Sequence, residues 1–219
     1  MAESRKNKVI VVGCGPGLKA YMSPKAMYHI KKAEILVGSR RLLKLFPGVD
    51  AEKVVLEKNY SVLTQKIAEW SRSKQVVVLV SGDPCFFSYT RMIVRKMGRE
   101  HCTIIPGISS IQLAFAAAGE SWDDACFISL HGRNNEYEHL VKKVREYNKV
   151  AILTDHKNTP AVIARHLLKH GVQKRQMFIC KNLSLPEESV LETDLASATN
   201  MNSGGSAVVI IKNTNHEVR

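Results

Sequence analysis

Three short loops carry residue types that could bind a small polar ligand. The first is Gly13-Cys-Gly-Pro-Gly17, whose alternating glycines permit positive φ and close approach of the backbone to a ligand. A dinucleotide-binding fingerprint would need glycine at position 18, which is Leu18, and an acidic residue where Val37-Gly38 stands. This loop alone therefore fits a structural turn as well as a ligand cradle.

The second loop, Ser81-Gly-Asp-Pro84, brings a carboxylate, a hydroxyl and backbone amides together, and Phe86-Phe87 follows it. Such a set suits a heterocycle that bears hydroxyl groups, although Asp and Pro also favour an ordinary type I turn. The third loop is Pro106-Gly-Ile-Ser-Ser110. Its serines could cap the following helix, or the helix N-terminus could bind a polar ligand group.

Short apolar runs that alternate with helical patterns position these loops. We expect strands at residues 8–12, 34–37, 53–56, 75–80, 103–105, 126–130, 150–153, 177–181 and 207–211. We expect helices that start at Ser23-Pro24 and at Ser39, and others over 61–70, 88–97, 109–118, 137–147 and 160–170. This alternation predicts an α/β fold with mainly parallel sheets, in which ligands bind at the carboxyl ends of strands.

The chain divides at a polar, turn-rich segment, Gly119-Glu-Ser-Trp-Asp-Asp124. We therefore expect an N-terminal α/β domain over residues 1–118, which contains the glycine-rich loops, and a C-terminal α/β domain over residues 119–219. A length of 219 residues suits two such domains.

The three loops, in this order and spacing, resemble those of the tetrapyrrole methylase family. The family's Gly-x-Gly-Pro-Gly, Gly-Asp-Pro and Pro-Gly-Ile-Ser-Ser motifs stand here at 13–17, 82–84 and 106–110. The resemblance implies an S-adenosylmethionine-dependent methyltransferase of two α/β domains, with the methyl donor in the cleft between them. It extends over nearly the whole chain, from Val9 to about Ile211.

Further motifs look like the subgroup that methylates C5 of precorrin-6Y or cobalt-precorrin-7 in cobalamin biosynthesis. They are Val37-Gly-Ser-Arg-Arg41, Ser81–Phe87, Ser129-Leu-His-Gly-Arg133, Leu153-Thr-Asp155 with Pro160, and Lys181-Asn-Leu183 with Pro186-Glu-Glu188. Fused versions continue into a second domain that methylates C15 and removes a carboxylate. We expect this chain, at 219 residues, to supply the C5 step alone, with a separate C15 enzyme as a partner.

The resemblance also implies which residues contact the ligands. The implied methyl-donor contacts are Pro16, Ser81, Gly82, Asp83, Phe86, Ser109 and Ser110, with Thr154 and Leu183 closing the pocket from the second domain. Among these, Asp83 is expected to accept hydrogen bonds from the ribose or amino group of the donor. The implied contacts to substrate carboxylates are Arg40, Arg41 and Arg133.

Two histidine positions bear on catalysis and metal binding. His131 ends a predicted strand and is a weak candidate for a general base; binding a substrate carboxylate or shaping the turn is the favoured interpretation. His166 and His170 have the i, i+4 spacing that can bind a metal on a helix. Since no third ligand is evident in the sequence, we expect a solvated helix face and no metal.

The net charge leaves alternatives open. Lys and Arg number 32 against 20 Asp and Glu, a formal charge of +12, which favours an anionic partner. A late precorrin, with its acetate and propionate groups, is one such partner. Same-fold methyltransferases that act on ribosomal RNA or a translation factor, or a non-enzymatic RNA-binding protein, are others. The basic residues are spread along the chain and aromatics make up only 6%, so we expect no nucleic acid.

The remaining features concern location and assembly. The longest apolar runs are far shorter than the ~20 residues that span a bilayer, and residues 1–8 are charged and lack a signal-peptide pattern. Five widely spaced cysteines without a Cys-x-x-Cys motif indicate a reducing compartment. We therefore expect a cytoplasmic protein with no membrane contact, and the family resemblance implies a homodimer.

Overall fold

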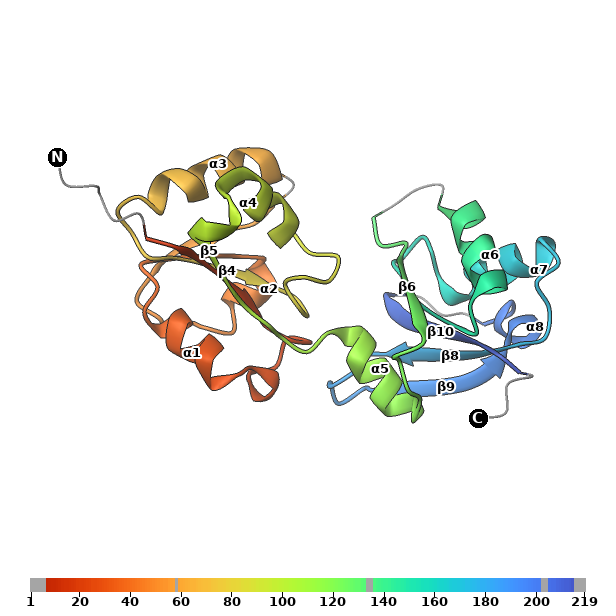
Figure 1. Ribbon diagram of the computed structural model, residues 1–219. Coiled ribbons are helices and arrows are strands. Elements are labelled where there is room, and N and C mark those ends of the chain that lie inside the picture. The colour runs from red at the N-terminus through yellow and green to blue at the C-terminus, as the bar shows by residue number, and fades with distance from the viewer. Residues whose placement is uncertain (1–6, 58, 133–135, 202–204, 215–219) are drawn as a thin grey trace. The chain divides into compact units, whose positions relative to one another are not determined.

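The computed structural model describes residues 7–57, 59–132, 136–201 and 205–214 (Figure 1). Its contacts divide the chain into two units, Met1–Ser109 and Ser110–Arg219. The α/β class and the two-part organisation are confirmed. The division falls before the helix at Ser110–Ala118, whereas we expected it after that helix.

The first unit is built around a parallel sheet of five strands in the order β3-β2-β4-β1-β5. The strands are β1 Val9–Gly13, β2 Ile35–Gly38, β3 Glu52–Val55, β4 Val76–Val80 and β5 Cys102–Ile105. The helices are α1 Pro24–Lys31, α2 Arg40–Leu43, α3 Tyr60–Trp70 and α4 Thr90–Met97, with 3₁₀ turns at Lys19–Tyr21 and Arg99–His101.

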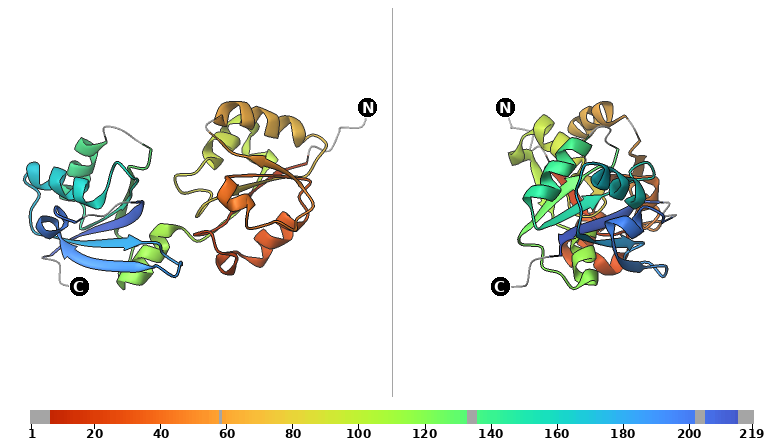
Figure 2. Two further views of the ribbon diagram at one scale, coloured as in Figure 1. Left: turned by 180° about the vertical axis from the view of Figure 1, so that it is seen from behind. Right: turned by 90° about the vertical axis from the view of Figure 1, so that its right-hand side faces the viewer.

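Every residue of β1 and β4 is buried because helices cover both faces of this sheet (Figure 2). On one face Ile10 and Val12 pack with Ile30 of α1 and Leu42 of α2. On the other face Val9, Val11 and Val78 pack with residues of α3 and α4. Alternate residues thus point into opposite cores, which explains the uninterrupted apolar runs of both strands.

Side-chain caps begin two helices of this unit close to the strand ends. Ser23 accepts a hydrogen bond from Ala26 N at 3.1 Å, and Pro24 occupies the first helical position of α1. Ser39 accepts one from Leu42 N at 3.3 Å and so starts α2 directly after β2. The start of α2 is therefore fixed at the carboxyl end of the sheet.

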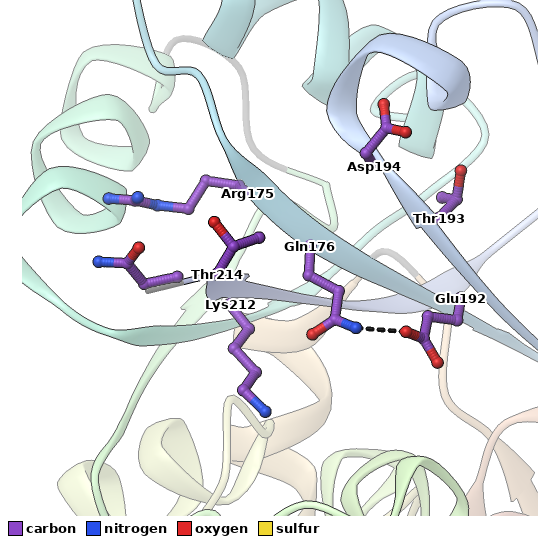
Figure 3. A pocket seen from close by; sticks show the side chains of 8 residues that line it. Arg175, Gln176, Glu192, Thr193, Asp194, Lys212 and Thr214 are labelled. Atoms are coloured by element: carbon purple, nitrogen blue, oxygen red, sulfur yellow. Dashed lines mark hydrogen bonds between the residues drawn. The ribbon is translucent and has the colours of Figure 1, made fainter. Parts of the chain in front are cut away.

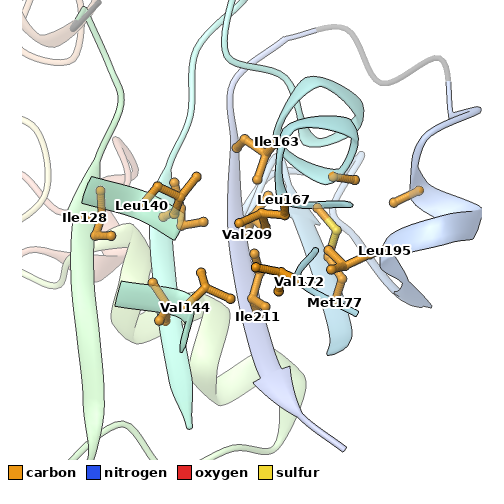
Figure 4. Packing of buried hydrophobic residues seen from close by; sticks show 14 of the residues in the cluster. Ile128, Leu140, Val144, Ile163, Leu167, Val172, Met177, Leu195, Val209 and Ile211 are labelled. Atoms are coloured by element: carbon orange, nitrogen blue, oxygen red, sulfur yellow. The ribbon is translucent and has the colours of Figure 1, made fainter. Parts of the chain in front are cut away.

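The second unit contains a mixed sheet of five strands in the order β6-β7-β10-β8-β9. The strands are β6 Ala125–Ser129, β7 Lys149–Leu153, β8 Arg175–Lys181, β9 Ser189–Asp194 and β10 Ala207–Asn213. The helices are α5 Ser110–Ala118, α6 Tyr137–Glu146, α7 Pro160–Lys169 and α8 Leu195–Ala198. Leu140, Val144, Ile163 and Leu167 of α6 and α7 pack on Val209 and its neighbours in one core (Figure 4).

The expectation of mainly parallel sheets is wrong for this second sheet. Only β6 and β7 pair in parallel, whereas β10 runs antiparallel to both β7 and β8, and β8 to β9. The short segment Asn182–Glu188 joins β8 to β9 and allows only a reversal of direction, because a parallel connection needs a crossover of about a dozen residues.

Helix α5 explains the shift in the boundary between the units. Its residues contact β10, β8 and β9, and Ala114 O lies 4.0 Å from the Cys180 thiol of β8. Ile111, Ala114 and Phe115 are buried. The apolar face of α5 therefore belongs to the second unit, although its start continues the third loop of the first unit.

Candidate functional site

The first and second loops are joined directly at the carboxyl end of the first sheet. Gly15 N donates to Gly82 O at 3.3 Å, and Gly82 N donates to Gly15 O at 2.8 Å. Both glycines have positive φ, +60° at Gly15 and +65° at Gly82. Because side chains disfavour this conformation, the reciprocal pair of hydrogen bonds accounts for both glycines.

The third loop packs against the other two through Gly107. A Cβ at Gly107 would lie 2.5 Å from Gly82 O and 2.7 Å from Gly13 C. A Cβ at Gly13 would in turn lie 2.7 Å from Gly82 O. The backbones of the three loops therefore lie in direct contact. They leave no space for a Cβ atom at Gly13 or Gly107. We call this the glycine contact of Gly13, Gly82 and Gly107.

Asp83 joins the second loop to the third. Its Oδ2 accepts a hydrogen bond from Gly107 N at 3.1 Å, and its Oδ1 accepts one from Cys85 N at 2.8 Å. A carboxylate has about four lone-pair positions, so two such bonds leave acceptor capacity for a ligand. Asp83, expected as a contact to the methyl donor, is therefore also a structural link between loops.

The rest of the second loop forms an exposed edge next to Asp83. The Phe86 and Phe87 rings lie edge to face with their centroids 4.7 Å apart. Ser81 is exposed, Phe86 is half-buried, and Pro84 is buried beneath them. A hydroxyl, a carboxylate and an aromatic ring therefore lie on one loop, a set that could bind a nucleoside through its hydroxyls and its base.

The two serines of the third loop lie on either side of the point where the chain passes from the first unit to the second. Ser109 is buried, and Ser110 is the first residue of α5. Six of the residues lie in the loops at the carboxyl ends of the strands of the first sheet: Pro16, Ser81, Gly82, Asp83, Phe86 and Ser109. Their role as methyl-donor contacts stays a prediction.

The two predicted substrate arginines of α2 have different surroundings. Arg40 forms an exposed ion pair with Glu57 at 2.9 Å. Arg41 donates to Pro16 O at 3.1 Å and to Ser81 Oγ at 2.9 Å, so its guanidinium contacts the first and second loops. Arg133 lies outside the described residues.

The thiols next to these loops are not activated as nucleophiles. Burial raises the pKa of Cys14 to about 12, although the nearby Arg41 charge acts in the opposite direction. Burial also raises the pKa of Cys85, and the Asp83 carboxylate adds to this effect. Since the thiolate is the reactive form, neither cysteine supplies a nucleophile at neutral pH.

Thr154 and Leu183 lie at one end of the second sheet. Thr154 follows β7 and is buried; its hydroxyl donates to Ala207 O at 2.8 Å and accepts from Ala207 N at 2.8 Å. Leu183 follows β8, whose last residue Lys181 pairs with Ala207. Both residues therefore surround the start of β10, and Thr154 uses its hydroxyl to hold that strand.

Asp155, which the sequence placed in a family-like motif without a role, organises the turn that contains His131. Its Oδ2 accepts from Gly132 N at 2.8 Å, while its Oδ1 accepts from Asn158 N at 2.8 Å and Lys157 N at 2.9 Å. Burial opposes ionisation of Asp155, but these backbone hydrogen bonds outweigh it and lower its pKa to about 2. The signal in the sequence was an Asp two residues after the end of a buried strand.

His131 itself is exposed at the end of β6. Its Nδ1 lies 3.3 Å from Thr154 O. This contact fixes the ring beside Thr154 and Asp155. A role as general base stays a prediction.

A separate hollow lies at the opposite end of the second sheet (Figure 3). It is lined by Arg175 and Gln176 of β8, by Glu192, Thr193 and Asp194 of β9, and by Lys212, Asn213 and Thr214. Gln176 bonds Glu192, Asp194 caps α8 through Ser197, and Lys212 pairs with Glu120. Lys212 and both acidic side chains bond within the protein, and the hollow lies at the other end of the sheet from Thr154, so this hollow is not the candidate site.

Metal binding and membrane insertion concern the described residues. Within them, no three His, Cys, Asp or Glu side chains are arranged to hold a metal ion, and the His166 and His170 rings stack with centroids 4.3 Å apart. In the same part of the chain, no helix has the length and apolar character needed to cross a bilayer.

The fold and loops define a class. It is an α/β protein of two units, one with a parallel sheet and one with a mixed sheet, and glycine-containing loops lie at the carboxyl ends of the parallel strands. Residues 8–199 match the family model described as Tetrapyrrole (Corrin/Porphyrin) Methylases. The chain belongs to this family.

Relatives and solved structures agree with this assignment. A cobalt-precorrin-7 C(5)-methyltransferase from Salmonella typhimurium is 37% identical over 201 residues, 92% of this chain and 97% of that protein. A precorrin-6Y methylase structure from Archaeoglobus fulgidus has a TM-score of 0.71 at 25% identity, over 96% of this chain and 99% of that one. A uroporphyrin-III C-methyltransferase from Thermus thermophilus, in complex with S-adenosylhomocysteine, has a TM-score of 0.73 at 22% identity, over 94% and 97%.

The glycine contact generates a prediction about Gly107. Changing Gly107→Ala should lower the free energy of unfolding by about 1–3 kcal/mol, because the new Cβ would overlap backbone atoms that have no rotamer to escape into. Urea denaturation measures this change. Gly48→Ala is the control: nothing lies within 4 Å of its ideal Cβ, so stability should be unchanged or slightly higher. Equal stability of the two variants would contradict the tight contact.

The lowered pKa of Asp155 gives a prediction about pH. The folded pKa of about 2 lies below the unfolded value of 3.8, so the ionised group stabilises the fold above about pH 4. This contribution is lost as the pH falls towards 2. Asp155→Asn should be less stable than the parent protein at pH 7, and the difference should shrink between pH 4 and pH 2. A difference that stays constant over this range would contradict the role of Asp155.

Proposed function

We propose that this chain is an S-adenosylmethionine-dependent C-methyltransferase that methylates C5 of a late precorrin, cobalt-precorrin-7 or precorrin-6Y, in cobalamin biosynthesis. The observation that carries this proposal is the 37% identity to the Salmonella enzyme, which extends over 97% of that protein's length. The match to the archaeal precorrin-6Y methylase structure at 25% identity supports it independently.

The methyl donor follows from the family and from the chemistry of the loops. S-adenosylmethionine, when bound, supplies a methyl group on a positively charged sulfur, so displacement needs no protonation of the leaving group. The T. thermophilus relative, which holds S-adenosylhomocysteine, supports this donor. The loop residues fit it, because Asp83 and Ser81 offer an acceptor and a hydroxyl for the ribose and amino groups, and Phe86 offers a ring beside them.

The contribution of the chain in this proposal is binding and orientation. Pro16, Ser81, Gly82, Asp83, Phe86, Ser109 and Ser110 hold the donor, and Thr154 and Leu183 close the site from the second unit. Holding two reactants in a near-attack arrangement can supply about 7–11 kcal/mol of the barrier. The glycine contact supports such a role, because loops packed backbone to backbone keep their donors and acceptors in fixed positions.

The charge of the chain suits the proposed substrate. A late precorrin is a polycarboxylate, and a formal charge of +12 favours its approach. Arg40 and Arg133 are the proposed carboxylate contacts. We also propose that the chain works as a homodimer in the cytoplasm and that a separate enzyme performs methylation at C15, in line with a relative named for C5 alone.

Methyl transfer itself tests the proposal. The protein is incubated without oxygen with methyl-labelled S-adenosylmethionine and either a late precorrin or ribosomal RNA. The precorrin should become labelled, and the new methyl carbon should appear at C5 in the NMR spectrum of the product. The RNA should remain unlabelled. Labelling of RNA alone would contradict the proposal and would support a same-fold RNA methyltransferase.

Asp83 provides a test of the donor site. Asp83→Ala should weaken binding of S-adenosylhomocysteine at least about tenfold, because it removes a charged acceptor and also the link to Gly107. Isothermal titration calorimetry measures this affinity. Asp50→Ala, which removes an exposed carboxylate elsewhere in the first unit, should leave it unchanged. Equal binding by the Asp83 variant and the parent protein would remove Asp83 from the site.

A further inference from the structure

Arg41 has surroundings that a simple ligand for substrate carboxylates does not need. It lies on α2, which starts after β2, and the buried side chains of Leu42 and Leu43 anchor the helix on the sheet. In the strand order, β4 is next to β2, and β1 is next to β4. Arg41 reaches Ser81 after β4 and Pro16 after β1. One side chain thus connects the carboxyl ends of three adjacent strands.

The planar guanidinium suits this connection. Its NH1 donates to Pro16 O at 3.1 Å and its NH2 to Ser81 Oγ at 2.9 Å, two acceptors on two different loops. A guanidinium presents its donors as a rigid fork, whereas a lysine ammonium is a single point charge on a flexible chain. The residue type at position 41 therefore matters beyond its charge.

Gly17 provides an independent observation. An ideal Cβ at Gly17 would lie 2.0 Å from Arg41 NH1, and Gly17 has φ +112°. Any side chain at this position would occupy the space that the guanidinium fills. The φ of +112° by itself favours glycine at position 17, and the absence of a side chain leaves the space that the Arg41 guanidinium occupies.

The contact with Ser81 also sets the direction of a proton. Since Arg41 has only protons to give, Ser81 Oγ must be the acceptor in this hydrogen bond. The hydroxyl proton of Ser81 is therefore directed away from Arg41. At the exposed edge of the second loop, this orientation makes Ser81 a donor towards a ligand acceptor.

We propose that Arg41 is a positioning residue, which clamps the first loop to the second and orients the Ser81 hydroxyl towards the methyl donor. It acts on the donor through Pro16 and Ser81, and its positive charge is not the property that the reaction needs. This inference rests on the proposed function, because it gives Arg41 a role at the donor site of the same reaction.

The test compares Arg41→Gln, Arg41→Lys and Lys44→Gln. Lys44 is an exposed lysine at the end of α2, so its variant removes one positive charge without touching the clamp. Both Arg41 variants should bind S-adenosylhomocysteine about tenfold more weakly, because neither can bridge both acceptors. The KM for the precorrin should stay within about twofold of the parent value. Lys44→Gln should match the parent protein in both measurements.

A double-mutant cycle with Ser81→Ala tests whether Arg41 acts through Ser81. The loss of affinity in the combined Arg41→Gln and Ser81→Ala variant should be clearly smaller than the sum of the single losses. Additive losses would contradict the orientation of Ser81 by Arg41. A higher KM for the precorrin in Arg41→Gln, restored in Arg41→Lys, would overturn the clamp and make Arg41 a carboxylate ligand.

Hydrogen exchange of the unliganded protein separates this inference from the proposed function. Amides of residues 13–17 and 81–83 should exchange about tenfold faster in Arg41→Gln than in Lys44→Gln, with unchanged exchange in the second unit. Equal exchange in these loops would overturn the clamp whatever the protein binds. If the parent protein fails to bind S-adenosylhomocysteine, the proposed function fails, and the exchange measurement still decides about the clamp. Arg41→Lys serves as a second variant with the same expected exchange, because it keeps the charge but cannot bridge both acceptors.

Discussion

The contact among Gly13, Gly82 and Gly107 is the constraint on which the rest of the candidate site depends. At Gly13 and at Gly107, a Cβ would lie 2.8 Å or closer to backbone atoms of another loop. The first and second loops cannot separate without losing the hydrogen bonds between Gly15 and Gly82, and the third loop cannot move away without losing the bond from Gly107 N to Asp83. The polar groups beside the contact, above all Asp83 and Ser81, take their positions from it.

Two charged side chains extend this contact in different directions. Asp83 bonds to Gly107 and so ties the second loop to the third, while Arg41 bonds to Pro16 and Ser81 and so ties the first loop to the second. Both links cross between loops that are far apart in the sequence but follow neighbouring strands. A small ligand bound to these loops would therefore contact one connected surface. Catalysis by positioning requires such a surface.

Much of this arrangement could be predicted from the sequence because it follows local rules. The apolar runs of β1 and β4, the Ser23 cap of α1 and the three glycine-rich loops could be identified from composition and spacing. The antiparallel course of β10 could not, because a buried apolar run carries no information about its direction. The exposed edge strand β9 was missed for lack of an apolar pattern, since almost all its residues are exposed.

In the candidate site, too, the sequence predicted local features and not contacts between distant residues. The loops were found, but the partners of Arg41 were not, because a contact across 25 and 40 positions has no local signal. The family resemblance implied a contact to a substrate carboxylate, whereas the two hydrogen bonds of Arg41 lead to Pro16 and Ser81 in the loops. The role of Asp155 was not predicted for a similar reason, since its partner Gly132 follows a different strand.

Hydrogen exchange with and without S-adenosylhomocysteine tests the central claim most directly, because it reports where a ligand binds without requiring the precorrin. The account predicts that the ligand slows exchange in residues 13–17, 81–87 and 106–110 together, as expected of a single connected site. Protection confined to the hollow around Arg175 and Asp194, or protection of only one loop, would contradict it.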